Sequence, residues 1–151
     1  MTGPGAAPRP GAAPGGATPR EVFARLGAGI SAGRWHELAA LYAEDAVVDQ
    51  PFALPPAPPR LAGRAAIDRH FRAAARGPLA LRARNVVVHD TADPEVIVAE
   101  FDYDGRVATT GRAFRVANIQ VLRIRDGLIV ETRDYHDHPG LARAMGRGVG
   151  G

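Results

Sequence analysis

Apolar residues recur at the spacing of an α-helix in three stretches of the first half of the chain. The first stretch, 22–30, follows Thr18, a residue type that caps helices. The second covers 35–42 and the third covers roughly 64–75. A shorter apolar segment at 141–145 is compatible with one more turn or two of helix. The pattern therefore predicts three N-terminal helices and a short helix near the end.

From residue 79 onward the helical spacing gives way to alternation, which is typical of β-strands. An earlier short strand is predicted over 45–52, and the proline-rich stretch 53–63 is expected to lack regular structure. Asp126-Gly127 predicts a tight hairpin between the last two strands. This order predicts an α+β fold with the helices on one face of a curved, mostly antiparallel sheet. The four long strands are expected at 79–90, 94–107, 111–125 and 128–138.

Composition bounds the chain to one folded domain, because 151 residues suffice for a single core. The Gly/Ala/Pro-rich residues 1–17 and the glycine-rich 146–151 are expected to be disordered, which leaves 18–145 as the domain. The absence of cysteine excludes disulfides and thiolate chemistry. No apolar run is long enough to span a membrane and no signal pattern is evident, so a cytoplasmic protein without membrane contact is expected.

The basic character of the chain resides in its tails. All 19 basic residues are arginines, a usage typical of GC-rich bacterial genomes. Between Glu21 and Asp137, 15 arginines accompany 16 acidic residues, so the folded part is close to neutral. A nucleic-acid-binding protein would be expected to concentrate basic charge on its fold, and nucleic acid is therefore not an expected partner.

Alternation along the last two strands indicates which polar side chains face the helices. One face of this hairpin carries several arginines and is expected to be solvated. Asp134 and His136 on the last strand fall on the opposite, apolar face, and so do Asn118 and Gln120 on its partner. Because polar groups on an apolar face need partners or a wet cavity, these four side chains predict a pocket under the helices.

The strand before this hairpin carries a second set of polar residues in the stretch 97–104. Its three carboxylates, Glu100, Asp102 and Asp104, share one face and are expected to face water and pair with arginines. Phe101 and Tyr103 then fall on the other face and are expected to line the same pocket.

Three segments, "YAEDAVVDQPF", "GRAAIDRHF" and "TGRAFRVANIQVLRIRDGLIVETRDYHD", resemble the nuclear transport factor 2-like superfamily. The resemblance covers roughly 20–145 and is strongest to the SnoaL-like polyketide cyclase, ketosteroid isomerase and limonene epoxide hydrolase branches. It implies a cone-shaped α+β barrel that dimerises through its sheet. The outward residues Ile119, Val121, Ile129 and Tyr135 are expected to serve such a homodimer. Because this fold hosts many reactions, the resemblance does not fix one.

Two mechanisms of these relatives do not transfer to this chain. The catalytic aspartate of the isomerase corresponds to Gln50, so that form of steroid isomerisation is not supported. The "RDY" aspartate of the epoxide hydrolase corresponds to Asp134, but its arginine and second aspartate fall at Phe101 and Tyr103. Epoxide hydrolysis by that triad is therefore not supported either.

The remaining hypothesis is a cofactor-independent enzyme of specialised metabolism, an isomerase, cyclase or hydrolase. It would act by acid–base catalysis on a largely apolar, polyketide-like or terpenoid-like molecule. Asp134, His136 and Tyr103 are the expected catalytic residues. The expected substrate-binding residues are Gln50, Asn118, Gln120, Phe101, Phe52, His70 and Trp35.

Alternatives remain open from the sequence. Asp134 can anchor its strand, His136 can be a rim residue, and His70 and Trp35 can belong to the core. "HDH" at 136–138 has the look of a ligand pair, but no third ligand is evident, so no metal is expected. A non-catalytic ligand-binding or dimeric interaction module of the same fold is the alternative function.

Overall fold

The computed structural model describes residues 16–147. The predicted tails therefore lie largely outside the described residues, although Gly16 and Ala17 are described and lie beside the Gly127 turn. The elements in chain order are α1 (Pro19–Ser31), the 3₁₀-helix η1 (Trp35–Leu41), β1 (Tyr42–Asp49), β2 (Arg60–Ala62), α2 (Arg64–Arg76), β3 (Leu79–Asp90), β4 (Val96–Val107), β5 (Ala113–Arg125), β6 (Leu128–His136) and α3 (His138–Ala144).

Local sequence signals place α1 and the β5–β6 hairpin as predicted. The Thr18 hydroxyl accepts a hydrogen bond from the Glu21 backbone N–H at 3.2 Å, and Pro19 opens the helix. Asp126 and Gly127 both have positive φ, at 51° and 77°. This is the conformation that a two-residue type I′ turn requires, and Asp-Gly supplies it.

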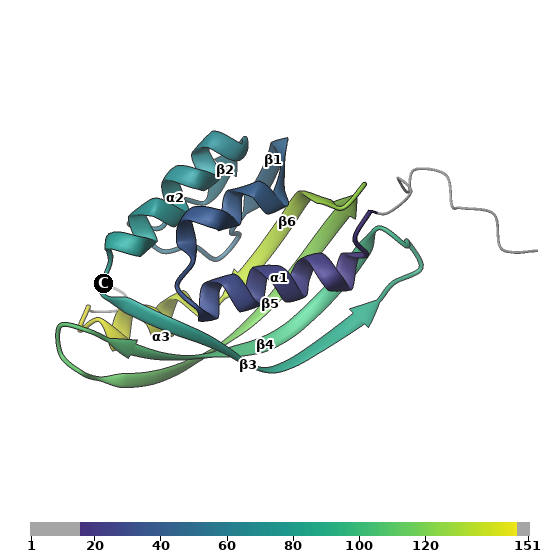
Figure 1. The fold of residues 1–151 in the computed structure, drawn as a ribbon. Helices are drawn as coiled ribbons and strands as arrows, with labels where there is room; N and C mark the ends of the chain where they lie inside the picture. Colours follow the sequence, from purple (N-terminus) through teal and green to yellow (C-terminus); the bar gives the residue numbers. More distant parts are fainter. Residues whose placement is uncertain (1–15, 148–151) are drawn as a thin grey trace, which may run out of the picture.

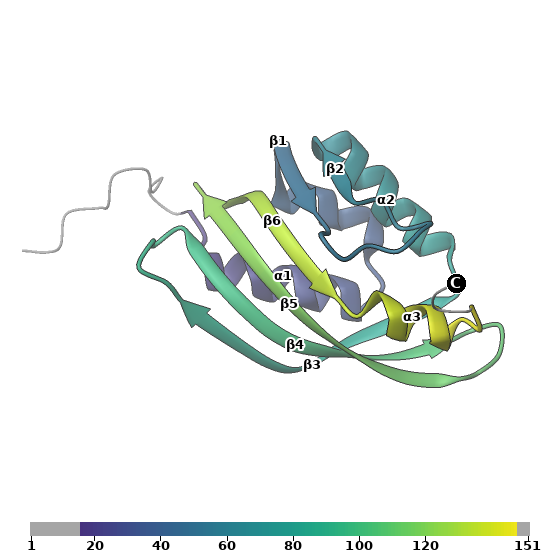
Figure 2. The ribbon, with the colours of Figure 1, turned by 180° about the vertical axis from the view of Figure 1, so that it is seen from behind.

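The strands form one six-stranded sheet in the order β2-β1-β6-β5-β4-β3. Only β1 and β6 run parallel among the paired strands, so the predicted mostly antiparallel sheet is confirmed. The helices α1, η1 and α2 lie over one face, and the opposite face is not covered by a helix of the described chain (Figures 1 and 2). The sheet is open, with β2 and β3 as its edges, and the expected cone-shaped barrel is not confirmed.

Two elements differ from the sequence-based expectation for the first half. The predicted helix at 35–42 is a 3₁₀-helix over Trp35–Leu41, and Tyr42 already begins β1. The stretch 53–63, expected to be irregular, contains β2. Residues 60–62 follow the last proline of the loop and keep their backbone N–H groups, so they can pair with β1. The helix α2 thus follows two strands, β1 and β2, where the sequence predicted one.

A β-bulge near the start of β6 changes which of its residues face inward. The pairing shifts between Arg123 with Glu131 and Ile124 with Ile129, which leaves Val130 as an extra residue. Ile129 is therefore fully buried beneath the helices, although uninterrupted alternation placed it outward. Beyond the bulge, Thr132 and Asp134 face inward as the alternation from the C-terminal end predicts.

The carboxylates of β4 face outward, as expected. Asp104 pairs with Arg115 at 2.7 Å and with Arg84 at 3.7 Å, and Glu100 contacts His89 at 2.7 Å. Arginine pairing was expected for all three carboxylates, but Glu100 contacts a histidine and Asp102 accepts from Asn85. Solvent screens these exposed pairs, so each contributes little to stability, and the inner face of the sheet is left free of them.

Candidate functional site

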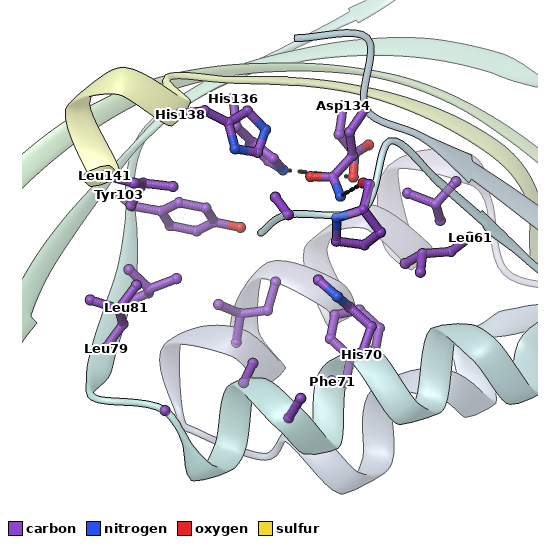
Figure 3. Close-up of a pocket in the computed structure, with 18 of the residues that line it drawn as sticks. Leu61, His70, Phe71, Leu79, Leu81, Tyr103, Asp134, His136, His138 and Leu141 are labelled. Carbon is purple, nitrogen blue, oxygen red and sulfur yellow. Dashed lines mark hydrogen bonds and ion pairs between the residues drawn. The ribbon is translucent and has the colours of Figure 1, made fainter. Parts of the chain in front are cut away.

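A cavity of about 590 Å³ lies between the inner face of the sheet and the layer formed by η1 and α2 (Figure 3). This volume is in the range that holds a small organic ligand. Its walls are mostly apolar and come from α2, the loop at 54–58, the start of β3, and α3. The apolar lining includes Trp35, Val48, Leu61, Ile67, Phe71, Leu79, Leu81 and Leu141.

Because side chains alternate along a strand, several polar side chains of β4, β5 and β6 lie on one wall of this cavity. Tyr103 comes from β4, Asn118 and Gln120 from β5, and Asp134 from β6. Gln120 and Asp134 are direct cross-strand partners, as are Asn118 and His136. All of these except His136 are at most 9% exposed. The sequence-based prediction that these side chains share a pocket is confirmed.

Asp134 and His136 lie side by side at the centre of the polar wall. His136 Nε2 is 3.7 Å from Asp134 Oδ2, and His136 Nδ1 is 2.7 Å from Asn118 Oδ1. Asp134 Oδ1 is buried and has no hydrogen-bond partner among the described residues, and the same holds for Gln120 Oε1. Asp134 is therefore not tied to backbone donors among the described residues, and its buried Oδ1 is desolvated without a compensating hydrogen bond.

Tyrosine hydroxyls add two neutral donors. Figure 3 shows the Tyr103 hydroxyl pointing into the cavity toward the Asp134 side. Burial raises the pKa of Tyr103, and the Asp134 carboxylate raises it further. Burial also raises the pKa of Tyr42, with Asp134 and Tyr103 adding to the effect. Both tyrosines therefore stay protonated and can donate a hydrogen bond to an oxygen that develops negative charge.

Two further histidines face the same space. His70 projects from α2 on the side opposite the strand wall (Figure 3). Burial lowers the pKa of His70. The Asp134 carboxylate opposes this shift, and His136 adds to it. His138, the first residue of α3, is 8% exposed, and its Nε2 has no partner among the described residues. Burial lowers the pKa of His138 and His136 adds to this, while Asp134 and Asp137 oppose it.

His138 and Tyr42 are two polar cavity residues that the sequence reasoning did not assign to the site. Their signals were present but ambiguous. His138 shares the alternation of His136, and their rings lie 5.9 Å apart, but the strand was expected to end there. Tyr42 fits a helical stripe that predicted a core residue, and it is 4% exposed as such a residue would be.

The remaining predicted binding residues occupy three different environments. Trp35 and Gln50 line the cavity, but the Gln50 side-chain amide donates to Pro58 O at 2.9 Å and so holds the proline-rich loop. Phe101 packs against Phe23 and Tyr103, outside the lining of the main cavity, with ring centroids at 5.6 and 5.1 Å. Phe52 is 65% exposed and stacks edge-on against Tyr135, away from the cavity, because Pro51 turns the chain after β1.

Within residues 16–147, no group of three or more His, Asp or Glu side chains is arranged to hold a metal ion. No helix in this part of the chain is long and apolar enough to cross a membrane. What the cavity offers chemically is thus a carboxylate, three imidazoles, two phenols and three amides around an apolar space. This set can exchange protons with a bound molecule and stabilise an oxyanion.

Known proteins resemble this chain in sequence. The SnoaL-like domain family profile matches residues 23–132. An uncharacterized Bacillus subtilis protein, YesE, is 34% identical over 112 residues, which is 74% of each chain. An uncharacterized PhzA/B-like protein of Pseudomonas aeruginosa is 35% identical over 95 residues, covering 63% of this chain and 67% of the relative.

Solved structures agree with this relationship. A proposed isomerase from Bacillus subtilis superposes with a TM-score of 0.79 at 30% identity, covering 85% of this chain and 93% of its own. A proposed polyketide cyclase from Pseudomonas putida gives 0.73 at 21% identity, covering 85% and 98%. A Catenulispora acidiphila protein of ketosteroid isomerase-like fold, bound to trimethylamine, gives 0.70 at 17% identity, covering 87% and 96%. The latter two show the fold alone. The match over residues 23–132 and the relative at 34% identity place this chain in the SnoaL-like domain family of the nuclear transport factor 2-like superfamily.

Proposed function

We propose that this protein is a cofactor-independent enzyme that moves protons on a small, largely apolar carbonyl compound. The observation that carries the proposal is the Asp134 carboxylate, which lines a cavity of about 590 Å³ and whose buried Oδ1 has no hydrogen-bond partner among the described residues. A free carboxylate oxygen in an apolar cavity is costly to keep for structure alone. It is well suited to act as a general base on a bound molecule.

The proposed step balances within the residues of the polar wall. Asp134 removes a proton from a carbon next to a carbonyl group, and the electron pair of that C–H bond forms an enolate. The Tyr103 hydroxyl donates a hydrogen bond to the enolate oxygen. The proton then returns from Asp134, or through His136, to the same or another carbon. Isomerisation returns it to a different carbon. In cyclisation the enolate carbon instead attacks a second carbonyl group of the same molecule, and the alkoxide that forms takes the proton from Asp134 to become a hydroxyl group.

The experiment uses 2-tetralone, an apolar bicyclic ketone with exchangeable C–H bonds beside its carbonyl. The protein and probe are incubated in D₂O, and deuterium uptake by the probe is followed by mass spectrometry. Uptake should exceed the buffer rate, and Asp134→Asn should lower the protein-dependent rate by about 10²-fold or more. The matched control is Asp102→Asn, an outward carboxylate on β4 that accepts from Asn85 and should leave the rate unchanged.

The outcomes separate the two candidate functions. Loss of exchange in Asp134→Asn with full activity in Asp102→Asn supports the enzyme. Binding of 2-tetralone, measured by calorimetry, without any protein-dependent exchange supports the alternative, a ligand-binding module. The cavity favours both over a purely structural role, because Trp35 and Phe71 line the space without filling it. A probe that neither binds nor exchanges contradicts the proposed substrate class.

We also propose that the protein forms a homodimer through the uncovered face of the sheet. Ile119 is 42% exposed there, and Val121 and Tyr135 lie on the same face. Ile129 does not contribute, because the bulge turns it inward. Analytical ultracentrifugation should find a dimer for the native chain and a monomer for Ile119→Arg. A native monomer at micromolar concentration would contradict this assembly. A cytoplasmic location stays a prediction.

A further inference from the structure

Asn118 stands at the end of a short chain of contacts that leads to the Asp134 carboxylate. Its side-chain Nδ2 donates to the Val116 carbonyl oxygen at 3.2 Å, and its Oδ1 lies 2.7 Å from His136 Nδ1. The other ring nitrogen, His136 Nε2, faces Asp134 Oδ2 at 3.7 Å. Asn118 is 4% exposed, so water does not compete freely for these contacts.

The chemistry of these atoms fixes the direction of each contact. A carbonyl oxygen only accepts, so the atom of Asn118 that faces Val116 must be the amide nitrogen. The atom that faces His136 is then the amide oxygen, which also only accepts. His136 Nδ1 must therefore carry a hydrogen atom. In the neutral imidazole this leaves Nε2 without a hydrogen atom, directed at the carboxylate.

We infer that Asn118 is a positioning residue that selects the Nδ1–H tautomer of His136 and thereby keeps Asp134 free to act as a base. Without Asn118, the neutral imidazole would place its hydrogen atom on Nε2 and donate it to Asp134 Oδ2, because a carboxylate is the stronger acceptor. A carboxylate that accepts such a bond is a weaker base. With Asn118 in place, Nε2 is instead a site that can take a proton from Asp134 during turnover.

This role differs from the substrate-binding role that the sequence suggested for Asn118, and it rests on the proposed function for its catalytic meaning. Gln120 provides the contrast within the same strand. It points to the same face two residues later and is 5% exposed, but its Oε1 has no partner among residues 16–147. Of the two buried amides on β5, Asn118 is hydrogen-bonded to the protein through both its nitrogen and its oxygen, whereas the oxygen of Gln120 is not.

The test is ¹⁵N NMR of the histidine side chains of the full chain at alkaline pH, where the imidazoles are neutral. His136→Gln identifies the His136 signals by their loss. In the native protein, His136 should show a hydrogen-bearing Nδ1 and a bare Nε2. In Asn118→Leu the hydrogen atom of the neutral imidazole should move from Nδ1 to Nε2, so the signals of the two nitrogens should swap their character. In Asn118→Asp, whose carboxylate still accepts from Nδ1, the native pattern should be retained. Gln120→Leu is the matched control and should also leave it unchanged.

A native His136 that carries its hydrogen atom on Nε2 overturns the inference, and this arm needs no variant. An unchanged tautomer in Asn118→Leu also overturns it. Both readouts come from the free protein, so they are independent of 2-tetralone turnover. If His136 shows the expected tautomer but 2-tetralone takes up no deuterium, then Asn118 positions His136 as inferred and the proposed reaction is wrong. If deuterium uptake is observed but the tautomer does not depend on Asn118, the proposed reaction is supported and the inferred role of Asn118 is wrong.

Discussion

Replacement of Thr132 by valine should stabilise the protein. Thr132 lies on the inner face of β6, pairs with Leu122 on β5 and Val48 on β1, and is 1% exposed. Its hydroxyl oxygen has no hydrogen-bond partner among the described residues. Because both strand neighbours are themselves buried apolar residues, this hydroxyl is desolvated without compensation.

The expected gain follows from two contributions. A buried hydroxyl without a hydrogen bond costs about 1–3 kcal/mol in mutational data. Valine replaces it with a methyl group of similar size, and the apolar surroundings favour that group by up to about 1 kcal/mol. After discounting for imperfect fit, Thr132→Val should raise the free energy of unfolding by about 1–2 kcal/mol. This corresponds to a rise of roughly 3–8 °C in Tm.

Urea unfolding followed by circular dichroism measures the change, with Thr132→Ser as the control. Serine keeps the hydroxyl and loses the methyl group, so it should lower stability by about 1 kcal/mol. Thr132 does not line the cavity, and deuterium exchange into 2-tetralone should stay at the native rate in both variants. If Thr132→Val lowers stability by as much as Thr132→Ser or more, the hydroxyl is hydrogen-bonded and the reasoning fails.

Three other predictions concern pH, packing and the loop. The pKa values of His70 and His138 are lowered from 6.5, so the unfolded chain binds more protons below that pH, and stability should fall as pH drops below 6.5. Urea unfolding across this range should show a shallower decline in the double variant H70Q/H138Q. Gly105→Ala should destabilise by about 1–3 kcal/mol in thermal unfolding, because a Cβ there would overlap the cross-strand Phe114 ring, and an additional Phe114→Ala should remove this clash. Gln50→Leu should speed proteolysis within the proline-rich loop, because the hydrogen bond that the Gln50 side chain donates to Pro58 O is lost, with the global Tm nearly unchanged.

Local signals in the sequence were sufficient for most of the fold. The Thr18 cap, the Asp126-Gly127 turn and the alternation of β4 and β5 each depend on neighbouring residues, and each was predicted correctly. The bulge at Val130 was not predictable in this way, because it is set by how β6 fits its partner strand. The extra residue at the bulge shifts the alternation by one position, so Ile129, which precedes it, faces inward and not outward as predicted.

The candidate site shows the same division. Asp134, Asn118 and Gln120 were placed correctly because strand parity alone determines their face. Phe52 was misplaced because the path of the chain after Pro51 depends on the loop and not on the parity of β1. His138 was missed because it follows the end of β6, where alternation no longer applies and the start of α3 sets its direction.

The position of β6 has a consequence for how the protein is made. This strand carries Asp134 and His136, it is the last strand among residues 16–147, and it lies between β1 and β5. Until it is synthesised, β1 and β2 cannot join the rest of the sheet, and the edge of β5 stays unpaired. Pairing between β1 and β6 also joins distant parts of the chain, which slows folding. The polar wall of the cavity and the completed sheet therefore form in the same late step. A fragment that ends before residue 128 would have neither.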